Sequence, residues 1–232
     1  MATRAAQIEV PVPARETIPP LETGDRLSRT EFERRYTAMP GLKAELIEGI
    51  VYVASPVYRR HGRPHFRLTG WCSVYEAATP GVIGSDNTSV RPDLDNEVQP
   101  DVNLCIDASR GGQSHSSEEK YIDGSPELVG EVATSSVSYD LHAKLNVYRR
   151  NGVKEYIVWR VLDQELDWFF LNEGEFQQLP ADEAGILKSR IFPGLWLDRA
   201  ALLRGDMKRV LEVLQEGLQS SEHSEFVARL GG

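Results

Sequence analysis

Two acidic residues in consecutive apolar segments are the side chains of this sequence best suited to chemistry. Asp101 lies in the segment 99–106 and Glu131 lies near the end of the segment 126–132, and both segments have the composition of buried strands. An ionised carboxylate is costly to bury unless it is paired or binds a metal. Two such acids in neighbouring strands predict a shared divalent cation. We expect Mg²⁺, or another divalent ion such as Mn²⁺, with Asp101 and Glu131 as its ligands.

Lys144 follows one predicted helix further along the chain and can add a fixed positive charge. Asp140, Lys144 and Tyr148 are spaced by four residues, so they share one face of that helix. A cation at this place would stabilise charge that develops on a phosphate under attack. The alternative is that Lys144 is only the ion-pair partner of Glu131. Asp140 is expected to be a helix N-terminal acid, and Tyr148 a core residue.

Further candidate catalytic residues precede the acidic pair. Glu45 would extend the metal site or orient a water, unless it is a surface residue of its strand. His61 would shuttle a proton or contact phosphate, and it lies in the densest basic stretch of the chain. That stretch is either a solvated helix entrance or a nucleic-acid contact. Its expected nucleic-acid-binding residues are Arg59, Arg60, Arg63 and Arg67.

Length and composition describe a soluble, acidic protein. The chain has 232 residues and a net charge of −9, which suits one sizeable domain and argues against a general nucleic-acid coat protein. A nuclease stays possible, because only a local patch must face the phosphates. No apolar stretch approaches the roughly 20 residues of a membrane span, and no secretory signal is recognisable. We therefore expect a cytoplasmic protein in which Cys72 and Cys105 are reduced and buried.

The elements that must position these residues can be ordered along the chain. We expect strands near 45–48, 50–53, 82–90, 100–106, 128–132, 153–159, 165–171 and 175–179, with helices near 60–78, 140–150 and 199–218. Strands interspersed with helices, with a late hairpin, predict an α/β (α+β) fold whose central mixed sheet is flanked by helices. We divide the chain into a disordered leader (1–26), one domain (27–200) and a C-terminal helix and tail (201–232).

Several motifs occur in the order of one known family. They are ELIEG at 45–49, His61, QPD at 99–101, PELVGEV at 126–132, the Asp140, Lys144 and Tyr148 set, and GVKEY at 152–156. The chain resembles, over about residues 27–200, the Uma2 family of restriction endonucleases, a branch of the PD-(D/E)xK nuclease superfamily. The resemblance implies a restriction-endonuclease-like core with Asp101 as the acid of the PD motif and Glu131 as the second acid.

The resemblance also has departures. The usual lysine of the superfamily would fall at Ala133, and in this family it moves to the next helix, at Lys144. Gly130 stands where a β-branched residue is typical. The implied function is a Mg²⁺-dependent endonuclease that hydrolyses phosphodiester bonds of DNA. The alternative is a non-catalytic protein on a nuclease fold that binds nucleic acid or another protein. We also expect a homodimer, with the apolar hairpin residues Trp168, Phe169 and Phe170 as its main support.

Overall fold

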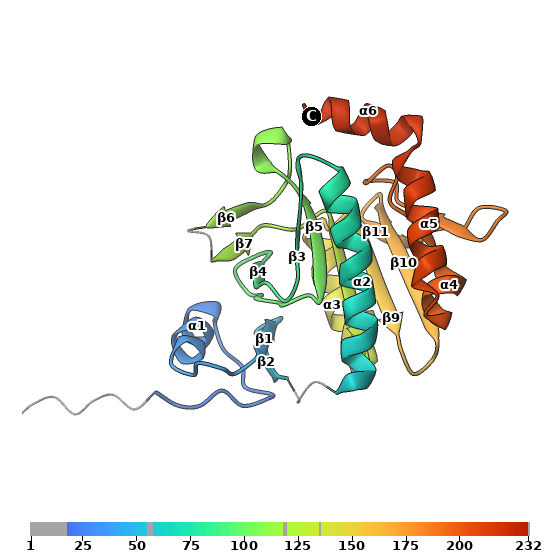
Figure 1. Cartoon of the computed structure of the whole chain (residues 1–232). Coiled ribbons are helices and arrows are strands. Elements are labelled where there is room, and N and C mark those ends of the chain that lie inside the picture. Colours follow the sequence, from blue (N-terminus) through green and yellow to red (C-terminus); the bar gives the residue numbers. More distant parts are fainter. Residues whose placement is uncertain (1–17, 55–57, 118–119, 135, 232) are drawn as a thin grey trace, which may run out of the picture.

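A six-stranded mixed sheet forms the centre of the computed structural model, which describes residues 18–54, 58–117, 120–134 and 136–231 (Figure 1). Its strand order is β11-β10-β9-β8-β5-β3, with β8 and β9 parallel and all other neighbours antiparallel. The strands are β3 (Val82–Ser85), β5 (Val102–Ile106), β8 (Leu128–Ala133), β9 (Glu155–Arg160), β10 (Glu165–Asn172) and β11 (Glu175–Gln178). The expected mixed sheet flanked by helices is confirmed.

Helices cover both faces of this sheet, because alternate residues of its central strands are apolar on both sides. Helix α2 (Arg59–Ala78) lies in front of the sheet in Figure 1, and α3 (Lys144–Arg150) lies behind it. A π-helical turn, η2 (Tyr139–Ala143), leads into α3. One apolar cluster joins Leu68 and Trp71 of α2 to the sheet, and a second joins Val147 of α3 to the opposite face.

Gly130 explains how closely α2 approaches the sheet. A Cβ atom at this position would lie 2.7 Å from Cγ1 of Val102 and 3.2 Å from Cδ2 of Leu68. Such contacts are too short for a well-packed core. The departure from a β-branched residue at Gly130 is therefore matched by the packing of α2 against β5 and β8.

The N-terminal part of the described chain forms a small lobe beside the sheet, made of α1 (Arg29–Thr37), β1 (Ala44–Ile47) and β2 (Ile50–Val53). The predicted disordered leader is too long. Leu21 is buried in the core of this lobe, and the backbone of residues 24–27 exchanges hydrogen bonds with β2 and the turn before it. These bonds satisfy polar groups on the edge of β2. Residues 1–17, the rest of the predicted leader, lie outside the described residues.

Several short strands lie in segments without a clear hydrophobic period. A three-stranded sheet is formed by β4 (Val90–Arg91), β6 (His115–Ser117) and β7 (Tyr121–Asp123), and η1 (Ala108–Arg110) is a 3-10 turn. The strands β12 (Ile186–Lys188) and β13 (Trp196–Asp198) form a hairpin. The strands β6 and β7 were not among the expected ones, because three residues per strand are too few for a readable alternation.

The C-terminal segment belongs to the same core as the rest of the domain. It forms α4 (Arg199–Arg204), α5 (Met207–Leu218) and α6 (Ser221–Arg229), not one helix and a frayed tail. Gly205, in the left-handed conformation, ends α4, and Asp206 caps α5. Phe226 and Leu230 are buried in the cluster that also holds Trp71. The boundary drawn at residue 200 therefore crosses one continuous core.

Phe66 and Val74 of α2 are apolar but 80% and 39% exposed. Trp168 and Phe170 are buried inside the chain, and Phe169 packs partly buried against the second apolar cluster, so these residues give little support to the expected homodimer. Cys72 and Cys105 are free and buried, as expected. None of the helices in the described part of the chain is long and apolar enough to cross a membrane.

Candidate active site

Asp101 and Glu131 lie opposite each other on one face of the central sheet. The antiparallel register of β5 and β8 pairs Val102 with Gly130, which places Asp101, immediately before β5, across from Glu131. Directly opposed residues have Cβ atoms about 4.5–5.5 Å apart. Both side chains are about 95% buried and both line one pocket. The geometry agrees with the expectation that the two carboxylates are close neighbours.

Asp101 is held by the chain on both of its carboxylate oxygens. Oδ2 accepts a hydrogen bond from the backbone N–H of Val132 at 2.7 Å, and Oδ1 lies 3.2 Å from Nε2 of His61. Burial alone would raise the pKa of Asp101. His61, the Val132 N–H and Lys144 together outweigh burial and hold this pKa below its ordinary value. Asp101 therefore stays ionised at neutral pH.

Glu131 shares one of its oxygens between two donors from α3. Oε1 accepts hydrogen bonds from Nζ of Lys144 at 2.9 Å and from the hydroxyl of Tyr148 at 3.0 Å. Burial raises the pKa of Glu131 well above its usual range; Lys144 opposes this shift, and the nearby carboxylates add to it. Both donors hold Oε1, so Oε2 is the oxygen of Glu131 left for another ligand.

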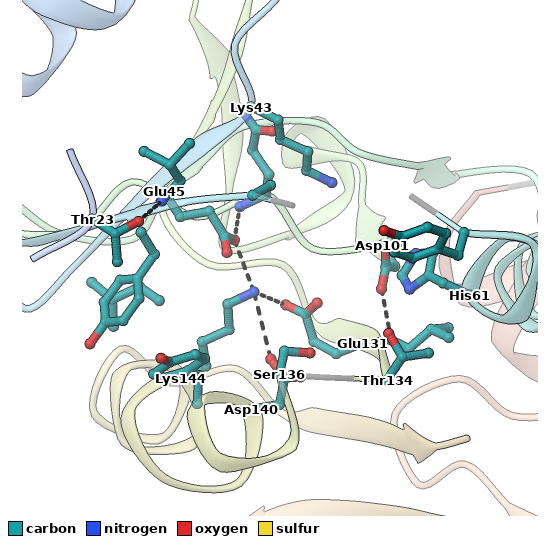
Figure 2. A pocket seen from close by; sticks show the side chains of 18 of the residues that line it. Thr23, Lys43, Glu45, His61, Asp101, Glu131, Thr134, Ser136, Asp140 and Lys144 are labelled. Atoms are coloured by element: carbon teal, nitrogen blue, oxygen red, sulfur yellow. Dashed lines mark hydrogen bonds and ion pairs between the residues drawn. The ribbon is translucent and has the colours of Figure 1, made fainter. Parts of the chain in front are cut away.

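The ammonium of Lys144 contacts three acids of the pocket (Figure 2). Its Nζ lies 2.9 Å from Oε1 of Glu45 and 3.7 Å from Oδ1 of Asp140, in addition to its contact with Glu131. Burial would lower the pKa of Lys144, but these carboxylates outweigh it and raise the pKa well above the ordinary value. The ammonium of Lys144 is therefore permanently charged under physiological conditions.

The pocket around these residues has a volume of about 700 Å³. Its walls come from β1 and β2, the N-terminal end of α2, the chain before β5, the end of β8, and η2 with α3. The charged side chains of the lining are Lys43, Glu45, Arg60, His61, Asp101, Glu131, Asp140 and Lys144. Figure 2 shows Glu45, Glu131 and Asp140 around Lys144, and Asp101 further away beside His61. The structure thus brings together all five predicted catalytic residues.

The four predicted nucleic-acid-binding arginines do not share one position. Arg60 lines the pocket, while Arg59 and Arg63 are exposed on α2 outside it. Arg67 packs its guanidinium over Gly205, at the corner between α4 and α5. The basic stretch therefore reaches from the pocket mouth along the outside of α2, and Arg67 points away from this path.

The donor set fits a cation held by two carboxylates. No group of three or more His, Cys, Asp or Glu side chains in the described ranges is arranged to hold a metal ion by itself. Mg²⁺ needs no such cage, because it keeps several waters and binds through one or two carboxylates and a substrate phosphate. Both oxygens of Asp140 are buried without a hydrogen-bond partner among the residues that the structure describes. Four acids and one buried ammonium leave an excess of negative charge that a divalent cation would neutralise.

Two side chains of the site have a contact beyond the role expected from the sequence. Tyr148 is a core residue, as expected, and its hydroxyl also donates to Glu131. Asp140 lies in the first turn of η2, as expected for a helix N-terminal acid, and it is also buried in the pocket next to Lys144. The spacing by four residues already placed both on the face of Lys144. The backbone N–H of Gln99, which donates to Oε1 of Glu45 at 2.7 Å, had no signal in the sequence.

A mixed sheet with helices on both faces and a buried acid pair on adjacent strands defines the restriction-endonuclease-like class. A family model described as "Putative restriction endonuclease" matches residues 29–200, and the chain belongs to this family, Uma2. No curated protein sequence matches the chain. A crystal structure titled as a putative nuclease belonging to DUF820 from Anabaena variabilis is similar in fold. It has a TM-score of 0.54 and 12% sequence identity, and the match covers 78% of this chain and 97% of that chain.

Proposed function

We propose that the protein is a divalent-metal-dependent endonuclease that hydrolyses phosphodiester bonds of DNA. The observation that carries this proposal is the opposed, buried pair of Asp101 and Glu131 in one pocket with the buried Lys144. Asp101 and Oε2 of Glu131 would hold Mg²⁺ or Mn²⁺. When bound, such a metal polarises the phosphate and lowers the pKa of a coordinated water.

Lys144 acts in this proposal as a fixed charge. Its raised pKa makes it a poor general base, because it keeps its proton throughout the neutral range. It orients the carboxylates of Glu131 and Glu45, and it supplies positive charge beside the place where a phosphate gains negative charge. The two roles predicted for Lys144, catalytic charge and ion-pair partner, are therefore compatible in one side chain.

The basic side chains of the pocket suit the phosphate backbone. Lys43, Arg60 and His61 line the pocket together with its acids, and His61 lies beside Asp101. Lys43 also donates to Oδ1 of Asn87 at 2.6 Å, which fixes its position. These cationic groups would bind the phosphates on either side of the scissile bond, and the acids would receive the metal.

The alternative function is non-catalytic binding on a nuclease fold. The observation in its favour is that His61 and the Val132 N–H already occupy both oxygens of Asp101. A metal would then have to displace His61 from its contact. The two functions differ in whether DNA is cut, since the alternative predicts binding of nucleic acid or of another protein without cleavage.

Cleavage of supercoiled plasmid DNA tests the proposal. The wild-type protein should nick and linearise the plasmid with Mg²⁺ or Mn²⁺, and EDTA should stop the reaction. Asp101→Asn should lose cleavage, while Asp163→Asn, a control in the partly exposed ion pair with Arg160, should retain it. Binding of plasmid without cleavage under any of these metals would favour the alternative.

A further inference from the structure

The outer face of α2 carries an aromatic ring that nothing inside the chain requires. Phe66 is 80% exposed, and Tyr58, the residue that precedes the helix, is 61% exposed. A large apolar side chain on the solvent face of a helix gains nothing from folding, because its ring stays in water. Since Phe66 stands eight residues after Tyr58, about 12 Å separates them along the helix axis.

Two glycines leave the surface on either side of Phe66 bare. Gly62 and Gly70, four residues before and after it, share its face of the helix. A Cβ atom added at either glycine would meet nothing within 4 Å, so the packing of the chain does not require a glycine there. Glycine inside a helix costs about 1 kcal/mol relative to alanine. The pair keeps both faces of the Phe66 ring accessible to an external group.

The charge around this face identifies the partner. Arg59 and Arg63 are exposed beside Phe66, and neither forms an ion pair with any acid in the described part of the chain. Arg60, the next cation toward the pocket, lies with its guanidinium 5.3 Å from the Tyr58 ring and lines the pocket with it. Exposed arginines beside an exposed aromatic ring offer a nucleic-acid strand positive charge for its phosphates and a stacking surface for its bases.

We propose that this face, defined by Tyr58, Arg59, Gly62, Arg63, Phe66 and Gly70, binds unpaired nucleotides of DNA and leads the strand into the pocket. A ring stacks only on a base whose face is free, so Phe66 selects a single strand or an unpaired segment rather than an intact duplex. Arg63, Arg59 and Arg60 then follow the backbone toward Tyr58 at the pocket wall. This inference rests on the proposed function in taking DNA as the ligand.

Binding without metal separates this face from the catalytic site. Fluorescence anisotropy in EDTA would compare a labelled single strand, its duplex and an abasic strand of equal length. Phe66→Ala should weaken binding of the single strand by about 5- to 100-fold and leave the abasic strand nearly unchanged. Leu94→Ala is the matched control, because Leu94 is 77% exposed in an acidic loop between Asp93 and Asp95. Since Phe66 is exposed, its replacement should not impair folding.

Three further variants give readouts that a purely structural role would not change. Phe66→Trp should keep the affinity, and its fluorescence should be quenched when a base stacks on the indole. Gly62→Ala should raise the melting temperature, because alanine favours the helix, and should lower affinity for the single strand, because the methyl group obstructs approach. Arg63→Ala should weaken base-containing and abasic strands alike and reduce the salt slope by about 0.7.

Equal single-strand binding by Phe66→Ala and the wild type would overturn the inference, as would an equal loss on the duplex. If the protein still cleaves plasmid DNA in that case, the proposed function is not contradicted. Conversely, if single-strand binding depends on Phe66 but no metal supports cleavage, the result would support this face as a DNA-binding surface and overturn the proposed catalytic function.

Discussion

The ammonium of Lys144 lies 2.9 Å from Oε1 of Glu131, and both side chains are buried in the same pocket. This pair joins α3 to the central strand β8. It also fixes the geometry of the acid that we propose as a metal ligand, so stability and activity depend on one contact.

Replacement of Lys144 by an apolar residue should therefore cost stability as well as activity. Lys144→Met leaves the buried Glu131 and the half-buried Glu45 without their cation, and we expect a loss of about 3–5 kcal/mol in the free energy of unfolding, measured by urea denaturation. Lys208→Met, in an exposed ion pair with Glu212, should change stability by less than about 1 kcal/mol. Mg²⁺ should restore part of the loss in Lys144→Met. A variant as stable as the wild type would show that Lys144 is not needed to hold the acids.

The hydroxyl of Tyr148 should contribute more than that of its neighbour Tyr156. Tyr148 donates to the carboxylate of Glu131 at 3.0 Å, whereas Tyr156 donates to the backbone carbonyl of Asp140 at the same distance. Hydrogen bonds to charged groups contribute about 1.5–3 kcal/mol, and neutral ones about 0.5–1.5 kcal/mol. Tyr148→Phe should thus destabilise the fold more than Tyr156→Phe in urea denaturation. Equal losses would indicate that Glu131 is protonated in the folded protein.

Gly130 should tolerate no side chain. Gly130→Ala places a methyl group 2.7 Å from Cγ1 of Val102, so α2 or β5 must shift, at a cost of about 1–3 kcal/mol. Gly70→Ala is the control, since its added methyl group meets open space and should be neutral or stabilising. Thermal unfolding of both variants measures the difference. Similar melting temperatures would mean that the contact between α2 and the sheet relaxes at little cost.

Buried Glu155 should make stability depend on pH. Burial raises its pKa to about 7, although Ser189, the Arg190 N–H and Trp168 donate hydrogen bonds that act against the shift. A folded-state pKa above the unfolded value near 4.5 means that the folded state holds the proton more tightly. The contribution of Glu155 is therefore full below about pH 4.5, falls as the pH rises to about 7, and is constant above that.

The variant Glu155→Gln isolates this effect from other titrating groups. The decrease in unfolding free energy between pH 5 and pH 8 should be smaller in Glu155→Gln than in the wild type, by up to about 3 kcal/mol. The variant itself should be less stable overall, because a Gln amide cannot accept all three hydrogen bonds. Parallel pH profiles for the two proteins would contradict the raised pKa.

The strands and the acids of the site were predictable because each has a local signature. Continuous apolar runs marked β8 and β9, and an acid inside such a run marked Asp101 and Glu131 as costly side chains in need of partners. The shared helix face of Asp140, Lys144 and Tyr148 followed from their spacing by four residues. These features depend on residues close in sequence, which is why a single chain reveals them.

The remaining features depend on contacts between distant residues. The hydrogen bond from Tyr148 to Glu131 requires α3 to cross β8. The pairing of β4 with β7 has no corresponding alternation of apolar and polar residues in the sequence. Residues 24–27 look like a leader because their hydrogen bonds go to β2 and its turn and not to each other. A search for hydrophobic periodicity treats Phe66 as an apolar residue, although its ring is exposed to solvent.

Calorimetric titration of Mn²⁺ into the metal-free protein tests the central claim most directly, because it measures the proposed site without a DNA substrate. We predict one binding event in the wild type and none in Asp101→Asn, which keeps a carbonyl oxygen for the Val132 N–H and should therefore stay folded. Matching circular dichroism spectra and melting temperatures would verify the folding of the variant. Mn²⁺ binding of equal heat and stoichiometry in the two proteins would contradict the assignment of Asp101 as a metal ligand.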